Sequence, residues 1–378
     1  MSRNGVAGCV WLFVMASGCT GPDADPPMWF DTEVVAEAWW GLELGVGGRS
    51  LVHVAPDGRA VFGSPDGRVF IEPSPGEAPI AHGPFEGLEE RVLTPAVSGD
   101  FVLMRNVTGD LLSIDTSDDT VLWQSVDHMP VIATDASGPV AVMRRNTVDP
   151  GTRARDLETG DVLWTIEEDA DVFDPQAASG GRVCGISGPR VVVVDAVSGD
   201  VDWTTEHGLG ELSETSEFEP RCIMHGQGIL VFGETPAGGD RAFVLFDADG
   251  AEVARTTWPL TPLPVDIVPR ADGRIVAWSE SAMIVFDDQL QEEERFGDRV
   301  PAAVDPVSGN MYLFTDGGMV LTNSDFEPIW AGGLGRPDLA YREIGAVVVG
   351  DLVYAADAQD GVLGQDRWTR YVALGPPR

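Results

Sequence analysis

The sequence predicts an all-β protein, and three observations lead to this prediction. Short runs of alternating or β-branched residues fill the chain from Trp39 onward, and such runs are typical of strands. Asp-Gly dipeptides separate several of these runs, as at Asp57-Gly58 and Asp272-Gly273. Glycine tolerates the positive φ that tight hairpin turns require. Finally, the segment Val191–Trp203, with the sequence VVVVDAVSGDVDW, recurs along the chain.

The recurring segment consists of an apolar strand, an acidic or amide residue and a turn rich in small residues. Its copies follow one another at intervals of about 40 residues, which is the period of a propeller blade. Four-stranded units of this length bury their faces only against their neighbours, so the repeat predicts a β-propeller. We expect eight four-stranded antiparallel blades, with a weaker eighth unit at Asp351–Leu374, and seven blades as the alternative. The copies are Arg68–Ile80, Leu111–Trp123, Arg153–Trp164, Val191–Trp203, Phe243–Arg255, Met283–Arg295 and Met319–Trp330.

Three copies keep an Asp, a turn residue four positions later and a Trp eight positions later. This pattern resembles the AxDxxTGxxxW repeat of pyrroloquinoline-quinone-type propellers. The resemblance implies that the Trp docks between blades and that the Asp and Gly shape the turn between the two outer strands. A row of tryptophans lining a cofactor pocket is the alternative. The residues to which the resemblance gives the structural role are Asp115, Trp123, Asp156, Gly160, Trp164, Asp195, Gly199, Trp203 and Trp330.

The N-terminal segment reads as an export signal. Arg3 precedes the apolar run Val6–Met15, which is too short to span a bilayer as a stable helix. The run ends in Ala16-Ser17-Gly18-Cys19, which resembles the bacterial lipobox. The resemblance implies that residues 1–18 are a lipoprotein signal peptide and that Cys19 carries the lipid. Thr20 rather than Asp follows the cysteine, which by the same resemblance implies the outer membrane; ordinary secretion is the alternative.

Two further divisions of the chain follow from composition. Residues 19–37 contain the polar, proline-rich stretch Thr20–Pro27, TGPDADPP, and such composition is typical of a semi-rigid tether. Residues 38–378 carry the repeats and are expected to form a single propeller domain.

Cys184 and Cys222 are the cysteines that remain beyond the lipobox. An even pair in an oxidising compartment predicts a disulfide, and two separately buried thiols are the alternative. The pair is separated by about one repeat, so the two residues would lie on neighbouring blades.

The charge of the chain excludes several kinds of function. The formal net charge is -37, and every basic residue is Arg, because the sequence contains no Lys. Schiff-base chemistry and P-loop phosphate binding both need lysine and are therefore excluded. Nucleic acids and anionic lipid headgroups bind to clustered Lys and Arg, so we expect no nucleic-acid partner.

Little in the sequence indicates catalysis. Quinoprotein dehydrogenases share the repeat, yet the vicinal cysteines that many of them carry are missing here. The five histidines occur singly, without HExxH or HxH spacing, and predict no metal site. The run Asp247–Gly250 begins like a calcium loop but lacks the later acidic ligand, so we interpret it as a hairpin turn. We therefore expect no cofactor, no metal and no enzyme activity.

One interval between copies is longer than the others, and the excess lies in Glu206–Arg221, EHGLGELSETSEFEPR. Insertions in propellers project as loops from a rigid scaffold, where binding residues are commonly placed. This segment is therefore the candidate binding loop, with a solvated insertion of no function as the alternative. Its candidate binding residues are Glu206, His207, Glu211, Glu214, Glu217 and Arg221.

Together these observations predict a non-catalytic, lipid-anchored propeller of the bacterial cell envelope that binds proteins or cell-surface polymers. In anchor, size and repeat type the chain resembles the propeller lipoprotein of the outer-membrane protein-assembly machinery. A divergent quinoprotein-like oxidoreductase, dependent on pyrroloquinoline quinone, is the alternative. Fold alone does not decide between the two.

Overall fold

A computed structural model of the chain gives the arrangement of most of its residues. The structure describes residues 34–44, 52–55, 58–64, 66–86, 93–105, 111–125, 131–135, 140–144, 151–167, 173–210, 220–226, 228–237, 240–259, 266–279, 282–297, 300–315, 318–331, 346–360 and 366–378.

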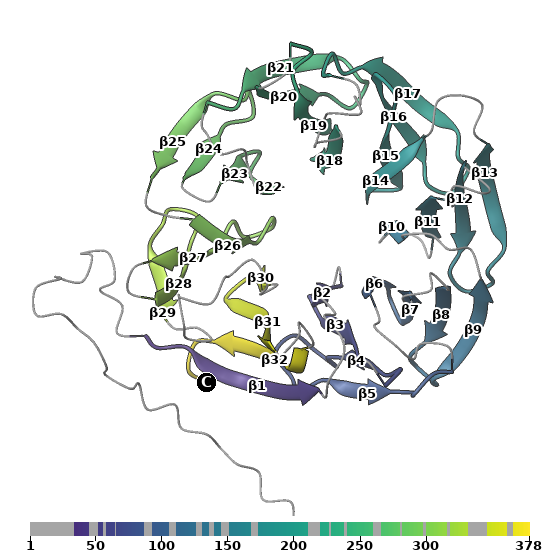
Figure 1. The fold of residues 1–378 in the computed structure, drawn as a ribbon, viewed down its shortest axis with the longest axis vertical. Coiled ribbons are helices and arrows are strands. Elements are labelled where there is room, and N and C mark those ends of the chain that lie inside the picture. Colours follow the sequence, from purple (N-terminus) through teal and green to yellow (C-terminus); the bar gives the residue numbers. More distant parts are fainter. Residues whose placement is uncertain are drawn as a thin grey trace, which may run out of the picture.

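The described strands form eight four-stranded antiparallel sheets, which stand around a common axis like the blades of a propeller (Figure 1). The prediction of an all-β propeller with eight blades is confirmed, and the seven-blade alternative is wrong. Among the described residues there is no helix that is long and apolar enough to span a bilayer.

The first four blades follow one another along the chain. Blade 1 contains β2 (His53–Val54), β3 (Ala60–Gly63), β4 (Val69–Ile71) and β5 (Ile80–His82). Blade 2 contains β6 (Leu93–Ser98), β7 (Phe101–Arg105), β8 (Leu111–Asp115) and β9 (Thr120–Ser125). Blade 3 contains β10 (Val131–Asp135), β11 (Val140–Arg144), β12 (Gly151–Asp156) and β13 (Val162–Glu167). Blade 4 contains β14 (Asp174–Ser179), β15 (Arg182–Ser187), β16 (Arg190–Asp195) and β17 (Val201–Glu206).

The remaining blades complete the ring. Blade 5 contains β18 (Arg221–His225), β19 (Gly228–Glu234), β20 (Arg241–Phe246) and β21 (Glu252–Thr257). Blade 6 contains β22 (Asp266–Pro269), β23 (Ile275–Trp278), β24 (Met283–Phe286) and β25 (Glu292–Phe296). Blade 7 contains β26 (Val300–Val304), β27 (Met311–Thr315), β28 (Gly318–Thr322) and β29 (Pro328–Ala331). Blade 8 combines β30 (Ala346–Val349), β31 (Leu352–Asp360) and β32 (Asp366–Gly375) with β1 (Glu37–Leu44).

Blade 8 is built from both ends of the described chain. Its outermost strand, β1, pairs antiparallel with β32 from Glu37 opposite Gly375 to Leu44 opposite Thr369. Just before β1, Val35 forms a parallel bridge to Ala331 on the outer strand of blade 7. The expected tether therefore reaches the ring at blade 7, and its last residue, Glu37, is already part of a strand. The sequence pattern placed strands from Trp39 onward but did not assign β1 to the last blade, because its partner strand lies at the other end of the chain.

Apolar side chains pack between adjacent blades on both faces of each sheet. Every residue of β20 and of β24 is buried, because a neighbouring blade covers each face. At the seam between blades 8 and 1, the rings of Phe62 and Tyr371 stack with centroids 4.2 Å apart. The core is thus a series of inter-blade layers around the ring.

The strand order gives the ring two different faces. We call the face that holds the links from one blade to the next the connection face. The opposite face holds the turns between the two outer strands of each blade, and we call it the turn face. Since every inner strand runs in the same direction, Asp174, Arg221 and Asp266 all begin inner strands at the connection face.

Candidate functional site

On the turn face of blades 2 to 7, an Asp or Asn side chain closes the turn between the outer strands. In each of these turns its Oδ1 accepts a hydrogen bond from the backbone N–H two residues later, at 2.8 Å in Asp115, 2.9 Å in Asp156 and 3.0 Å in Asp195. Hydrogen bonds from Ser117 and Ser198 lower the pKa values of Asp115 and Asp195 below the ordinary value. Asp247 forms the same kind of turn, because its Oδ1 accepts from the N–H groups of Asp249 and Ala251. The repeated carboxylates therefore satisfy backbone donors.

The tryptophans of the repeat lie between neighbouring blades. The Nε1–H groups of Trp123, Trp164 and Trp330 each donate to a backbone carbonyl oxygen of the next blade, at 2.8, 2.8 and 2.9 Å. Trp164 rests on Gly199, whose φ is +75°, and a Cβ at Gly199 would lie 2.6 Å from its Cγ. A side chain at this position would displace the indole. We call this arrangement, a Trp ring of one blade resting on a Gly of the next, an inter-blade wedge.

Trp203 forms the same wedge without the hydrogen bond. A Cβ at Gly250 would lie 2.6 Å from its indole, but the buried Nε1 has no hydrogen-bond partner among the described residues. The carbonyl oxygen of Ala248 occupies the corresponding acceptor position and accepts instead from Nη2 of Arg182 at 2.9 Å.

Other residues fill three of the junctions. Between blades 5 and 6, the tryptophan position is Ala254 and the glycine position is Leu290, which has a φ of +58° and packs into the same apolar cluster. In blade 7 the glycine position is Phe326, whose ring lies 4.2 Å from that of Phe296 in blade 6. In blade 2 it is Asp119, which pairs with His82 of blade 1. The wedge is therefore one of several ways to fill a seam.

The seam that closes the ring is centred on Glu72. This carboxylate is 0% exposed and accepts from Trp40 Nε1 at 2.7 Å and from the Tyr354 hydroxyl at 2.7 Å. It also accepts from the backbone N–H groups of Ala60 and Gly76, at 2.9 and 3.1 Å. Burial raises the pKa of Glu72, although the hydrogen bonds oppose this effect. These contacts join β1, β31 and blade 1 at one point.

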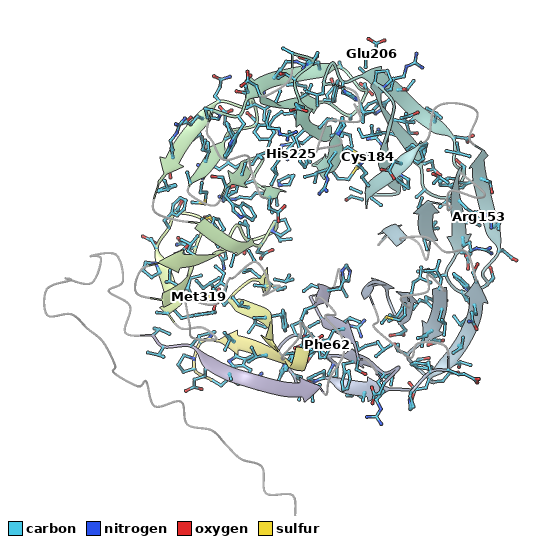
Figure 2. All side chains as sticks on the ribbon, viewed as in Figure 1. Phe62, Arg153, Cys184, Glu206, His225 and Met319 are labelled. Atoms are coloured by element: carbon cyan, nitrogen blue, oxygen red, sulfur yellow. The ribbon has the colours of Figure 1, made fainter. Side chains whose placement is uncertain are left out.

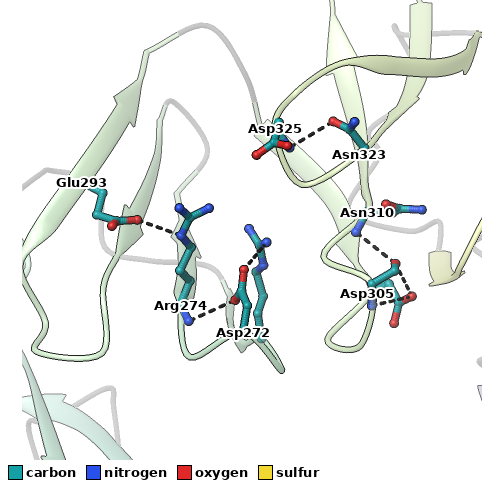
Figure 3. Close-up of polar contacts among 9 residues, drawn as sticks. Asp272, Arg274, Glu293, Asp305, Asn310, Asn323 and Asp325 are labelled. Carbon is teal, nitrogen blue, oxygen red and sulfur yellow. Dashed lines mark hydrogen bonds and ion pairs between the residues drawn. The ribbon is translucent and has the colours of Figure 1, made fainter.

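Polar side chains cluster on the turn face of blades 6 and 7 (Figure 3). Arg270 pairs with Asp272 at 2.5 Å and lies against Gly309 of blade 7, and Arg274 pairs with Glu293 at 2.9 Å. Asp305 accepts from the hydroxyl of Ser308 at 2.5 Å. Among the described residues, no three His, Cys, Asp or Glu side chains come together in a way that could hold a metal ion.

The connection between blades 4 and 5, residues 207–220, is fixed where it leaves blade 4. His207 is 0% exposed, its Nε2 lies 3.1 Å from the Gly188 carbonyl oxygen, and its Nδ1 accepts from the N–H of Leu209 at 3.0 Å. Leu209 is buried in the apolar cluster of this seam. The N–H of Gly210 then donates to the carbonyl oxygen of Glu234 at 2.7 Å. The His207 side chain is therefore buried where the connection leaves blade 4, and its role in binding stays a prediction.

Both ends of the connection meet over one glycine of β19. A Cβ at Gly233 would lie 3.2 Å from Cα of Pro220 and 3.3 Å from Cδ1 of Leu209, so a side chain there would push one of them away by a few tenths of an ångström. Glu206 lies at the outer perimeter of the ring (Figure 2), whereas Arg221 begins the inner strand β18. Both described ends of the connection are therefore fixed at the same glycine.

The other expected site residues are placed as follows. Glu206 and Arg221 are exposed at the two ends of the connection. Glu211, Glu214 and Glu217, as well as Cys19, lie outside the described residues. Cys184 and Cys222 are free thiols, and both are buried. The contacts of His207 and Gly233 could not have been found from the sequence, because neither residue belongs to a recognisable motif.

Comparisons with known proteins add a likeness in fold. No model of a protein family matches the chain, and a comparison with curated proteins found no match. Among solved structures, the chain is similar to the crystal structure of BamB from Moraxella catarrhalis, with 16% sequence identity and a TM-score of 0.47. The alignment covers 86% of this chain and 82% of that chain. A likeness at this level carries no argument about function.

Proposed function

We propose that the protein is a non-catalytic binding scaffold of the bacterial cell envelope, held at the outer membrane by a lipid on Cys19. The observation that supports this proposal most is the anchoring of residues 207–220. Their two ends are fixed together over Gly233, and a loop held by a rigid scaffold is a common place for binding residues.

The chemistry of the connection indicates the kind of partner. Between the fixed ends, the sequence places Glu211, Glu214, Glu217 and Glu219 within a short span that contains no basic residue. Such a segment attracts a surface with clustered positive charge and repels an anionic one. The partner in this proposal is therefore a protein or a cell-surface polymer that presents basic groups.

Neutralising the connection tests this binding role. We expect the triple variant E211Q/E214Q/E217Q to lose envelope proteins or polymers that the unchanged protein retains when both are crosslinked in intact cells and analysed by mass spectrometry. Leu209 and Pro220 stay in place, because both pack over Gly233. The matched control, E168Q/D169N/D171N, removes the same number of charges from the connection between blades 3 and 4. Equal loss in both variants, or no loss in either, would contradict the proposal.

The membrane anchor has its own test. In a bacterial host, the chain should incorporate labelled palmitate and sediment with the outer membrane, whereas the Cys19→Ser variant should do neither. A soluble wild-type protein without the label would contradict the lipid anchor and favour ordinary secretion. The binding role is tested separately by the crosslinking experiment.

The enzymatic alternative makes an opposite prediction. A divergent quinoprotein oxidoreductase should show a clear rise in Tm when pyrroloquinoline quinone and calcium are added together, because a ligand that binds the folded state stabilises it. A non-catalytic scaffold should show no such shift. A rise that saturates with the quinone concentration would overturn the proposal.

A further inference from the structure

The two buried cysteines face each other across the seam between blades 4 and 5. Cys184 lies on β15 of blade 4 and Cys222 on β18 of blade 5, and they are 0% and 2% exposed. Both belong to one apolar cluster, together with Val191 and Val231. Burial and the neighbouring Cys184 side chain both raise the pKa of the Cys222 thiol. Figure 2 shows Cys184 on the inner side of its blade.

Strand pairing fixes the position of each cysteine, with an irregularity in β14 between Pro175 and Ala177 beside Cys184. Cys184 pairs with Ala177 of β14 and with Val193 of β16, and Cys222 pairs with Val231 of β19. Gln176, the neighbour of Ala177, crosses the seam, because its Oε1 accepts from the N–H of Cys222 at 2.6 Å. The two thiols are therefore held in place by hydrogen-bonded backbone on both sides.

We propose that Cys184 and Cys222 form a disulfide that joins blades 4 and 5 when the chain folds in the presence of a disulfide oxidant. One thiolate attacks the disulfide of the oxidant and forms a mixed disulfide, and the second thiolate displaces the remaining oxidant sulfur. Two S–H bonds are lost and one S–S bond is formed. The two electrons pass to the oxidant, which leaves as two thiols, and the two protons balance these thiols through the solvent.

Burial determines when the bond can form. It raises the pKa of the Cys222 thiol well above its ordinary value, and the thiolate is the reactive form. In the closed seam, neither thiol is reachable by an oxidant. The bond therefore forms during folding, before blades 4 and 5 pack together, and is then shielded from reductants.

The disulfide would also stabilise the connection described above. Pro220, at one fixed end, precedes Cys222 by two residues, and Nε2 of Gln176 donates to its carbonyl oxygen at 3.3 Å. Leu209, at the other end, packs in the same cluster as both cysteines. This inference concerns the seam and does not depend on the proposed binding role.

Oxidative refolding tests the proposal directly. The full chain is unfolded in reductant, refolded with oxidised glutathione, alkylated under denaturing conditions and digested. We expect a linked peptide that contains Cys184 and Cys222, with two hydrogen masses fewer than the reduced pair, and a higher Tm than that of protein refolded in reductant. Alkylation of both residues in correctly refolded, oxidised protein would overturn the proposal.

Variants separate the bond from other effects of the oxidant. In C184A and in C222A, the remaining cysteine of the pair should be alkylated, and the double variant C184A/C222A should have the same Tm with and without oxidant. Alanine keeps the seam apolar, so these variants should fold. A redox-dependent Tm in the double variant would also contradict the proposal, because the effect would then come from other cysteines.

Discussion

At Glu72, one buried carboxylate accepts hydrogen bonds from Trp40 and Tyr354 as well as from its own blade. In blades 3 and 4 the corresponding residues, Asp156 and Asp195, lie near the surface and accept from their own turns. The longer side chain of Glu72 reaches across the seam that closes the ring. A conservative difference of one methylene thus changes a turn residue into a link between the two ends of the chain.

Replacing Glu72 by Gln should destabilise the protein by about 1–3 kcal/mol, because the amide nitrogen cannot accept and leaves buried donors without a partner. Burial raises the pKa of Glu72 above its ordinary value of 4.5, so the folded state binds the proton more tightly than the unfolded state. By linkage, the contribution of this group is complete below the unfolded pKa and falls as pH rises through the folded pKa.

The free energy of unfolding of wild type and E72Q, measured by urea denaturation from about pH 4 to pH 8, checks this direction. The advantage of the wild type should become smaller as pH rises. An advantage that grows with pH would show that hydrogen bonding to the carboxylate outweighs its burial.

The Trp164 wedge offers a second prediction for a single residue. Trp164 is buried against Gly199 and donates to the Ala196 carbonyl oxygen. Trp164→Ala should lower the free energy of unfolding by about 3–5 kcal/mol, because it leaves a cavity in the seam. Val162→Ala, at an exposed position of the same strand, is the control and should change it by less than about 0.5 kcal/mol. Similar losses in both variants would contradict the wedge.

At the level of elements, the turn between the outer strands needs a side-chain oxygen that accepts hydrogen bonds from its backbone N–H groups. Either a carboxylate or an amide oxygen can do this. In blade 7 the acceptor is Oδ1 of Asn323, which binds the N–H of Asp325 at 3.0 Å. Asp195 makes the same contact with Val197 in blade 4. An uncharged acceptor therefore already works in this protein.

Asp195→Asn should keep the stability of the wild type at pH 7 to within about 0.5 kcal/mol, whereas Asp195→Ala should lose about 0.5–1 kcal/mol. The pKa of Asp195 lies below its ordinary value of 3.8, so its contribution is present above that value and is lost as pH falls through the folded pKa. D195N should therefore lose less stability than the wild type between about pH 5 and pH 2. Thermal melts over this range give the comparison, and parallel acid curves would refute it.

The sequence predicted the blades well because each repeat carries its own turn chemistry. The marks at Asp115, Asp156 and Asp195 each fall in a different blade, at the same turn. The fillings of the seams were harder to predict. Between blades 5 and 6, the small residue Ala254 stands where other blades have Trp, and the large residue Leu290 stands where they have Gly. The repeat motif is therefore absent at this junction. The loss of a large side chain in one blade is offset by a large side chain in the next blade. A repeat pattern compares blades one at a time and cannot show such a contact between them.

For the molecule as a whole, the ring depends on a strand from the far end of the chain. Removing residues 1–44 deletes β1, together with the buried Trp40 and its bond to Glu72. We expect this truncation to lose the cooperative melting transition and to aggregate, because it exposes the edge of β32. Removing only residues 1–33 should preserve the melting transition and should not shift the protein into aggregates. Equal behaviour of the two truncations, by circular dichroism and size-exclusion chromatography, would refute the closure.

The candidate site was only partly predictable at this scale. The unequal repeat spacing located the connection between blades 4 and 5, since an insertion changes the period wherever it occurs. It could not distinguish residues that anchor the connection from residues that are presented by it. His207 is polar yet buried, and Gly233, which admits both ends of the connection, lies outside the inserted segment.

The parallel bridge between Val35 and Ala331 gives the ring a mechanical property. A load applied at the N-terminus meets this bridge before it meets β1, and two backbone hydrogen bonds flank the bridge, both at 2.9 Å. We expect the bridge to blade 7 to break first, because the force reaches it before it reaches the longer β1–β32 pairing in blade 8. Only a larger force would shear β1 out and open the ring. A protein pulled by its N-terminus would thus yield first at a contact that it does not need in order to stay closed.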